Sequence, residues 1–218
     1  MVKAALSKKL LLAPRKASRE HRRQQIMDAT IKTLAKRGYS QTTLTEVAVT
    51  AGLSHGLLNF HFETKEKLLT ETLLLMADEY RENWTTALAT APDAPEEQLN
   101  CLLLADFNDR ICHPDKLVAW CAFWGEAQSR PIYQQMCGAN DMEYIQELEK
   151  ICSRLIANGG YALDPVLVAR VIRVTVEGVW LDLITVSTPY SSEEALRTVF
   201  ACVAAFFPQH FDANGLRR

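Results

Sequence analysis

Helix start and stop signals follow one another along this 218-residue chain, and no segment alternates convincingly between apolar and polar residues with the two-residue period of a strand. Thr43–Glu46 and Ser191–Glu194 have the residue types of capping boxes, and Asp164–Pro165 places a capping side chain before a first-turn proline. Glycine or proline follows the end of most helical segments. The pattern predicts an all-α protein of about nine helices with no sheet.

The composition is that of a folded globular protein, with 48% hydrophobic and 23% charged residues. Its uncharged apolar stretches are shorter than the roughly 20 residues that a membrane span needs, and residues 10–13 are too short a run for a secretory signal. We therefore expect a cytoplasmic protein that does not enter a membrane. The six cysteines form no C-x-x-C pair, which favours reduced core residues over a metal site or disulfides.

Charge is distributed unevenly along the chain. Residues 1–67 contain 13 lysines and arginines against five acidic residues, although the whole chain has a formal net charge of −2. A basic segment suits a polyanion such as nucleic acid, and an acidic remainder limits non-specific attraction to it. Basic tails are also commonly no more than solvated, so this asymmetry raises the case for nucleic-acid binding only modestly. Residues 1–17 are expected to be a flexible basic tail.

The most informative stretch is residues 42–69, which read TTLTEVAVTAGLSHGLLNFHFETKEKLL. Thr43 opens one short helix that ends at Gly52, and Ser54 opens a second short helix. A preceding helix over residues 18–37 ends at Gly38. Two short helices joined through a glycine are typical of a helix-turn-helix, in which the second helix enters the major groove of DNA. Residues 18–64 are therefore predicted to be a three-helix DNA-binding domain.

The same stretch resembles the TetR family of bacterial transcriptional repressors at many fixed positions. The matching residues are Gly38–Tyr39, Thr42–Thr43, Val47–Ala48, Ala51–Gly52–Leu53–Ser54, Gly56, Leu58, His61–Phe62, Lys65 and Leu68. The resemblance implies a phosphate contact by Thr43 and a recognition surface formed by Ser54, His55, Gly56 and Asn59. It also implies that His61 and Lys65 clamp the DNA backbone.

Some of these roles have alternatives. Asn59 stands where the family commonly has tyrosine, which leaves the operator sequence open, although asparagine can bond adenine through two hydrogen bonds. His61 is either a phosphate contact or a packing residue. The basic residues before the domain either reach DNA as an N-terminal arm or are only solvated; they are Arg15, Lys16, Arg19, Arg22 and Arg23.

Residues 65–218 are predicted to form a second helical domain. Residues 164–187 are apolar on nearly every side of their helix, so this helix must be buried both against its own domain and against another surface. With residues 195–207 it supplies the seam of a homodimer, as the family resemblance also implies. The alternative is burial inside a monomer.

The family resemblance also implies that this domain holds a small-molecule effector. Residues 120–127 and 130–133 resemble a segment of the BetI branch, whose members respond to choline, a quaternary ammonium compound. Aromatic faces and a carboxylate suit such a cation, which has no N–H to donate. The candidate effector-binding residues are Trp120, Phe123, Trp124, Glu126, Tyr133 and Trp180. The alternatives are that these rings are ordinary core and that Glu126 pairs with Arg130.

These inferences predict a repressor that binds a palindromic operator in double-stranded DNA, associates with the nucleoid, and is released by an effector such as choline in glycine betaine metabolism. A regulator of another small molecule, such as one controlling efflux or catabolic genes, is the first alternative. A helical enzyme or a partner-binding protein is less favoured, because the sequence has no G-x-G-x-x-G, phosphate-loop, H-E-x-x-H or G-x-S-x-G motif. We expect no catalytic residues, cofactor or metal.

Overall fold

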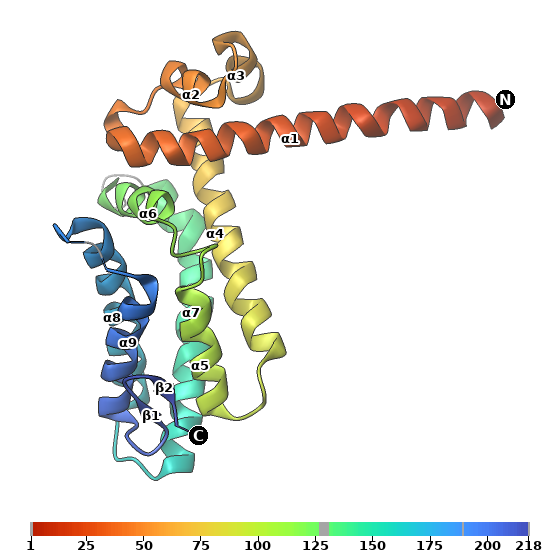
Figure 1. The fold of residues 1–218 in the computed structure, drawn as a ribbon. Helices are drawn as coiled ribbons and strands as arrows, with labels where there is room; N and C mark the ends of the chain where they lie inside the picture. The colour runs from red at the N-terminus through yellow and green to blue at the C-terminus, as the bar shows by residue number, and fades with distance from the viewer. Residues whose placement is uncertain (1, 127–130, 189, 218) are drawn as a thin grey trace. The chain divides into compact units, whose positions relative to one another are not determined.

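The computed structural model describes residues 2–126, 131–188 and 190–217, with side chains from residue 19 onwards except those of residues 132 and 133. In these ranges the chain consists of helices, the loops between them and one small hairpin (Figure 1). The all-α prediction is confirmed. The chain divides into two compact units, residues 1–73 and 74–218. No helix in the described ranges combines the length and the apolar character that crossing a membrane requires.

The first unit contains α1 (Val2–Gln41), α2 (Leu44–Ala51), α3 (His55–Phe62) and the start of α4 (Lys65–Thr90). Its core is formed by apolar side chains of α1, α2 and α3 and one of α4: Ile26, Ala29, Val47, Ala48, Leu58, Phe62 and Leu68. Because Leu68 belongs to this core, the first turns of α4 are part of the first unit, although we expect the second domain to begin at Lys65.

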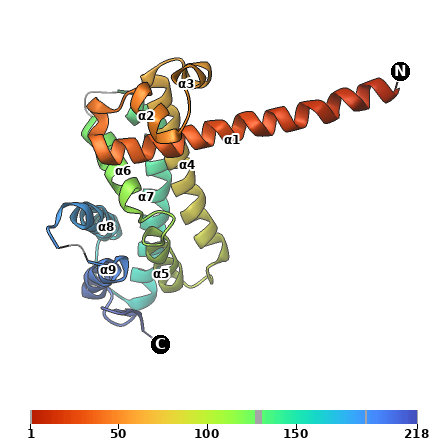
Figure 2. The same ribbon diagram turned by 45° about the horizontal axis from the view of Figure 1, so that its top comes forward.

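Helix α1 differs from the sequence prediction at its start and agrees with it at its end. Residues 2–17, for which we expect a flexible tail, continue α1 beyond α2 and α3 (Figure 2). This segment is rich in alanine, leucine and lysine, which favour the helix, and it contains one proline. Gly38, with φ +75°, interrupts the helix where the sequence predicts its end.

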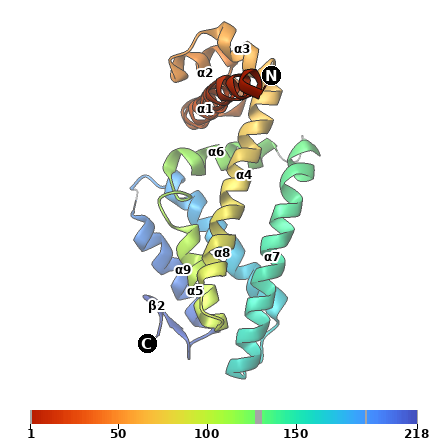
Figure 3. The same cartoon turned by 90° about the vertical axis from the view of Figure 1, so that its right-hand side faces the viewer.

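The second unit is a bundle of α5 (Pro95–Asp106), α6 (Pro114–Glu126), α7 (Pro131–Gly159), α8 (Pro165–Thr185) and α9 (Ser192–Phe206), with the remainder of α4. Helix α7 packs against α5 and α8, and α8 packs against α9 (Figure 3). One large core joins these helices and includes the aromatic side chains of Trp84, Phe107, Tyr144, Trp180 and Phe200.

A short antiparallel hairpin, β1 (Phe211–Asp212) and β2 (Gly215–Leu216), follows α9, and the prediction of no sheet is wrong at this point. Each strand has only two residues, which is too short for a strand period to appear in the sequence. The turn is stabilised by Asp212, whose side chain accepts a hydrogen bond from the Asn214 backbone N–H at 2.8 Å.

Candidate nucleic-acid interface and ligand cavity

The turn between α2 and α3 is fixed by backbone geometry and by capping side chains. Gly52 ends α2 in the left-handed conformation, with φ +65°, and the Leu53 N–H bonds the Ala48 carbonyl at 3.0 Å. The Thr43 hydroxyl accepts from the Glu46 N–H at 3.2 Å, and the Ser54 hydroxyl accepts from the Leu57 N–H at 3.3 Å. Thr43 and Ser54 are both exposed, and each acts first as a helix cap.

One face of α3 is exposed and carries three of the predicted recognition residues. His55, Gly56 and Asn59 lie on it, and Asn59 Nδ2 is 3.2 Å from His55 Nδ1. A Cβ built on Gly56 would meet no atom of the protein within 4 Å. Packing therefore does not require glycine at this position, and the missing side chain leaves room for another molecule to approach the helix.

Phe60 extends this face, and the sequence analysis does not identify it. Its side chain is 69% exposed, and the Arg19 guanidinium carbon lies 6.0 Å from the ring centroid. Phe60 follows Gly56 by one helical turn, whereas the core residues Leu58 and Phe62 lie on the opposite side. The four-residue spacing from Gly56 could have identified Phe60 from the sequence as a residue of the exposed face. An exposed aromatic ring on this face suits contact with a thymine methyl group.

The two predicted backbone clamps are engaged within the first unit. His61 is only 5% exposed, and its Nδ1 has no hydrogen-bond partner among the described residues. Burial, followed by the charges of Arg23, Arg19 and Arg22, lowers the pKa of His61 below its usual 6.5. The Lys65 ammonium donates to the carbonyl oxygens of Tyr39 and Ser40 at 2.9 and 3.0 Å. This geometry favours the packing role for His61 and a structural role for Lys65.

The candidate N-terminal arm is divided by its contacts. Arg19 and Arg22 are exposed, and the side chains of Arg15 and Lys16 lie outside the described residues. Arg23 instead donates to the His61 carbonyl at 3.0 Å and forms an ion pair with Glu71. Of the candidate arm residues with described side chains, Arg19 and Arg22 are therefore the two exposed to an anionic partner.

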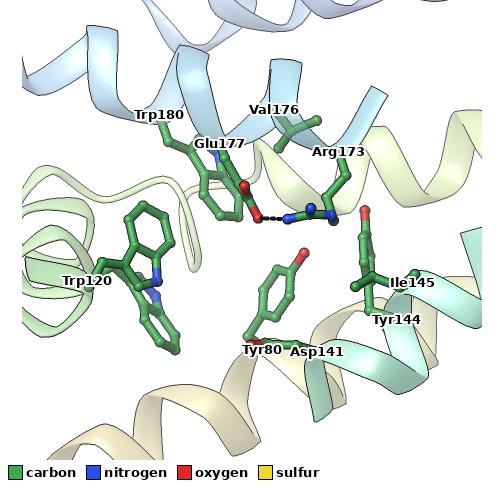
Figure 4. Close-up of a pocket in the computed structure, with 10 residues that line it drawn as sticks. Tyr80, Trp120, Asp141, Tyr144, Ile145, Arg173, Val176, Glu177 and Trp180 are labelled. Carbon is green, nitrogen blue, oxygen red and sulfur yellow. Dashed lines mark hydrogen bonds and ion pairs between the residues drawn. The ribbon is translucent and has the colours of Figure 1, made fainter. Parts of the chain in front are cut away.

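The second unit contains a partly open cavity of about 180 Å³ between α4, α6, α7 and α8 (Figure 4). A cavity of about 150 Å³ is known to hold a molecule as large as benzene, so this space admits a compact ligand. Its lining residues are Tyr80, Trp120, Trp124, Asp141, Tyr144, Ile145, Arg173, Val176, Glu177 and Trp180.

Five aromatic rings form much of the cavity wall. The indoles of Trp120 and Trp124, one turn apart on α6, stack with their ring centroids 6.3 Å apart. Tyr80 from α4 lies edge-on to Trp180 from α8 at 5.9 Å and is 5.7 Å from Tyr144 of α7. The rings hold one another in place and present both faces and edges, a geometry suited to a cation.

The charged groups of the wall leave an excess of one formal negative charge. Arg173 and Glu177, one turn apart on α8, form an ion pair of 2.6 Å, drawn as a dashed line in Figure 4. Asp141 of α7 is the third charged side chain. Burial raises the pKa of Asp141, Glu177 raises it further, and Arg173 opposes both effects. A positively charged ligand would relieve this imbalance.

A buried carboxylate lies directly behind two of the rings. Asp106, the last residue of α5, is fully buried, and its two carboxylate oxygens accept hydrogen bonds from Tyr80 at 3.0 Å and Tyr144 at 2.9 Å. Burial raises the pKa of Asp106 to about 7, although the two phenol hydrogen bonds act in the opposite direction.

Three of the six predicted effector-binding residues line the cavity: Trp120, Trp124 and Trp180. Phe123 is buried in the core, and Phe123 and Glu126 are both absent from the described lining. The side chain of Tyr133 lies outside the described residues. The aromatic residues of α6 thus form only one side of the cavity, through Trp120 and Trp124. The lining residues outside those six come from α4, α7 and α8: Tyr80, Asp141, Tyr144, Ile145, Arg173, Val176 and Glu177.

Comparisons with known proteins cover both units. Residues 26–72 match the family of bacterial regulatory proteins described as the tetR family, and residues 95–208 match the C-terminal part of BetI-type transcriptional repressors. The HTH-type transcriptional regulator BetI of Burkholderia thailandensis is 29% identical over 190 residues, and the match covers 84% of this chain and 92% of that protein.

Solved structures show the same fold. A putative transcriptional regulator from Pseudomonas aeruginosa PAO1 is 25% identical with a TM-score of 0.72, and the match covers 88% of this chain and 95% of that chain. A putative transcriptional regulator from Saccharomonospora viridis, solved in complex with choline, is 18% identical with a TM-score of 0.72, and the match covers 91% of this chain and 100% of that chain. The BetI-type match alone spans more than half of the residues, and the chain therefore belongs to the TetR family of transcriptional regulators, with a C-terminal part of the BetI type.

Proposed function

We propose that this protein is a repressor that binds a palindromic operator as a homodimer and leaves the DNA when a small organic cation enters the cavity. Choline or a related quaternary ammonium compound is the candidate effector, and glycine betaine metabolism is the candidate process. The observation that carries the proposal is a cavity with five aromatic rings and one excess negative charge. Family members are transcriptional regulators, and an enzymatic activity is not part of the proposal.

DNA reading is assigned to the exposed face of α3. His55, Asn59 and Phe60 offer hydrogen-bonding and apolar groups to base edges, and Gly56 allows close approach. Thr43 and Ser54 are exposed at helix N-termini, where backbone N–H groups favour phosphate. Two copies of α3 would need to stand about 34–36 Å apart to enter successive major grooves.

Effector recognition is assigned to the rings and carboxylates of the second unit. A quaternary ammonium has no N–H to donate, so aromatic faces and nearby negative charge are the means by which a protein can recognise it. Trp120, Trp124 and Trp180 provide indole rings, which are the best of the aromatic side chains for this contact. The choline complex of the Saccharomonospora viridis neighbour supports the same ligand class.

Release from DNA requires that the ligand favour one conformation of the dimer over another. The effector can shift this equilibrium only by the difference between its affinities for the two states. Tyr80 lies on α4, the helix that begins in the DNA-binding unit and continues into the cavity wall. We assign to α4 the transmission of ligand binding to α3.

The test combines DNA binding with calorimetry. The wild type should bind operator sequences selected from random DNA, and choline should release it from them. Asn59→Ala should bind these operators less specifically, with a loss of about 1–3 kcal/mol in the discrimination between operator and random DNA. Choline binding should fall about tenfold or more in Trp124→Ala and less in Trp124→Phe, which keeps a ring. Equal binding of choline and its uncharged carbon isostere 3,3-dimethyl-1-butanol would overturn the cation assignment.

One observation favours a second candidate, a zwitterionic ligand such as glycine betaine. Arg173 stands in the cavity wall beside Glu177, so its guanidinium can also bind a ligand carboxylate while the rings hold the ammonium group. Glycine betaine and choline therefore belong in the same titration. If glycine betaine binds more tightly than choline, and Arg173→Gln removes this difference in affinity, the zwitterion is the favoured effector.

A further inference from the structure

Asp106 is a fully buried carboxylate whose partners are two tyrosine hydroxyls rather than a cation. Tyr80 donates to one oxygen at 3.0 Å and Tyr144 to the other at 2.9 Å. Among the described residues, the hydrogen bonds and ion pairs of Asp106 include no lysine, arginine or histidine. A buried negative charge without a positive partner is costly to maintain, so this group requires an explanation.

The surroundings of Asp106 oppose its ionisation from several sides. It is the last residue of α5, where the helix dipole places partial negative charge. Its neighbours Tyr80 on α4 and Tyr144 on α7 are neutral phenols whose hydrogen bonds favour the ionised form, but burial and the charge of Glu177 on α8 outweigh them and raise its pKa. The Cys112 thiol, between α5 and α6, has its own pKa raised to about 11 by burial and by Asp109 and Asp106.

The positive charge that Asp106 lacks can come from the cavity. Tyr80 and Tyr144 both line it, as Figure 4 shows. The hydroxyl of each donates to Asp106, so these two residues connect the ligand space to the buried carboxylate. A phenol that donates to a carboxylate is polarised toward negative charge on its oxygen and ring. A cation resting against these rings would stabilise the ionised carboxylate, and the ionised carboxylate would strengthen the cation–ring contact.

We propose that Asp106 is the counter-charge of the bound cation: it acts through Tyr80 and Tyr144, and cation binding is coupled to release of the Asp106 proton to solvent. This inference rests on the cation-binding part of the proposed function. Asp106 is in this scheme a positioning residue, since it touches the tyrosines and not the ligand. It makes the effector response depend on pH near neutrality.

The sign of the effect follows from linkage. Because a cation lowers the pKa of a nearby carboxyl, binding removes the proton that Asp106 carries with a pKa of about 7. Choline affinity should therefore rise with pH and level off above about pH 8, and it should fall roughly 30-fold between pH 8 and pH 5.5. At pH 7, binding should release roughly half a proton for each site.

The experiment is calorimetry of the full-length protein with choline, in two buffers of different ionisation enthalpy and at several pH values. Asp106→Asn should remove the proton release that titrates near pH 7 and flatten the pH profile there. Tyr144→Phe removes a hydrogen bond that favours the ionised form, so the midpoint should move to higher pH. Asp109→Asn, a change at an exposed residue three positions further along the chain, is the matched control and should leave both readouts unchanged.

The outcomes separate this inference from the function on which it rests. Choline binding without proton release, with the same pH profile in Asp106→Asn, would overturn the role of Asp106 and leave the cation effector standing. Failure of choline to bind more tightly than 3,3-dimethyl-1-butanol would overturn the cation effector and this inference together. If Asp106→Asn does not fold, carbon-13 NMR of the wild-type Asp106 carboxyl decides: its pKa must fall when choline is added, and an unchanged pKa contradicts the proposal.

Discussion

The ammonium group of Lys65, the first residue of α4, lies 2.9 Å from the carbonyl oxygen of Tyr39 near the end of α1 and 5.5 Å from the centroid of the Tyr39 ring. A second hydrogen bond runs to the Ser40 carbonyl at 3.0 Å. The positive charge thus binds two carbonyl oxygens that follow the interruption of α1 at Gly38, while Lys65 itself begins α4. This contact joins two helices of the first unit.

Lys65→Ala should therefore weaken folding as well as DNA binding. Loss of charge-assisted hydrogen bonds predicts a fall of about 1–2 kcal/mol in the free energy of unfolding, measured by urea titration with circular dichroism. Lys67→Ala is the control, because Lys67 is exposed and pairs with Glu63 on the surface. Unchanged stability in Lys65→Ala, with a smaller salt dependence of DNA binding, would instead support a phosphate clamp.

His61 should make the first unit less stable in mild acid. Its pKa is lowered by burial and by nearby arginines, so the folded protein resists a proton that the unfolded chain accepts near pH 6.5. The free energy of unfolding should fall as the pH drops below about 6.5, by about 1.4 kcal/mol for each unit by which the pKa is lowered. Urea titrations at pH 7.5 and 5.5 measure this change.

The control for His61 is His21, which is exposed on α1. His61→Gln should reduce the loss of stability between pH 7.5 and 5.5, whereas His21→Gln should keep it. A role for His61 at phosphate predicts a different result: mild acid would tighten DNA binding and leave stability unchanged, because the protonated imidazole would be favoured only in the complex.

The helices of this protein could be predicted well from the sequence, because each is marked by local chemistry. Thr43, Ser54 and Asp164 cap helices as their residue types indicate, and Gly52 adopts the left-handed conformation that ends α2. Periodicity could not reveal the β1–β2 hairpin, whose strands are too short. The long first half of α1 also escapes such reasoning, because its terminal position and Pro14 suggest a tail.

The cavity could be predicted only in part, because its walls are joined by tertiary packing. The α6 rings Trp120 and Trp124 are visible as a local cluster, whereas Tyr80 and Arg173 come from helices far away in the chain. Phe123 on the same helix is also aromatic, but it is buried in the core. No local pattern distinguishes these cases, since burial depends on which helices meet.

A substitution of Gly56 should change DNA binding without lowering the stability of the protein. A Cβ at this position meets no protein atom within 4 Å, and alanine is a better helix former than glycine by about 1 kcal/mol. Gly56→Ala should therefore leave the protein as stable as the wild type or more so, while operator affinity falls by roughly 1–3 kcal/mol through crowding at the base edges. Thermal melts and fluorescence anisotropy measure the two effects.

A second glycine-to-alanine change controls for helix propensity. Gly138 lies in α7, and a Cβ there also meets nothing within 4 Å. Gly138→Ala should share the gain in stability without weakening operator binding. If Gly56→Ala binds the operator as tightly as the wild type, the exposed face of α3 does not approach DNA closely and the assignment of recognition residues fails.

The exposed stripe on α8 should be the centre of the homodimer seam. Leu167, Val174 and Leu181 are 53%, 51% and 48% exposed, and they are spaced seven residues apart, which places them on one face of the helix. Apolar side chains at this spacing are typical of helices that pack against a partner.

Val174→Glu would place a charge in that seam from each copy, so the protein should become monomeric by light scattering and lose its operator affinity. Leu104→Glu on α5, at a residue 47% exposed, is the matched control and should remain dimeric. If Val174→Glu stays dimeric and Leu104→Glu becomes monomeric, the dimer interface lies on α5 and not on α8. The distance between the two recognition helices would then be set by a different seam.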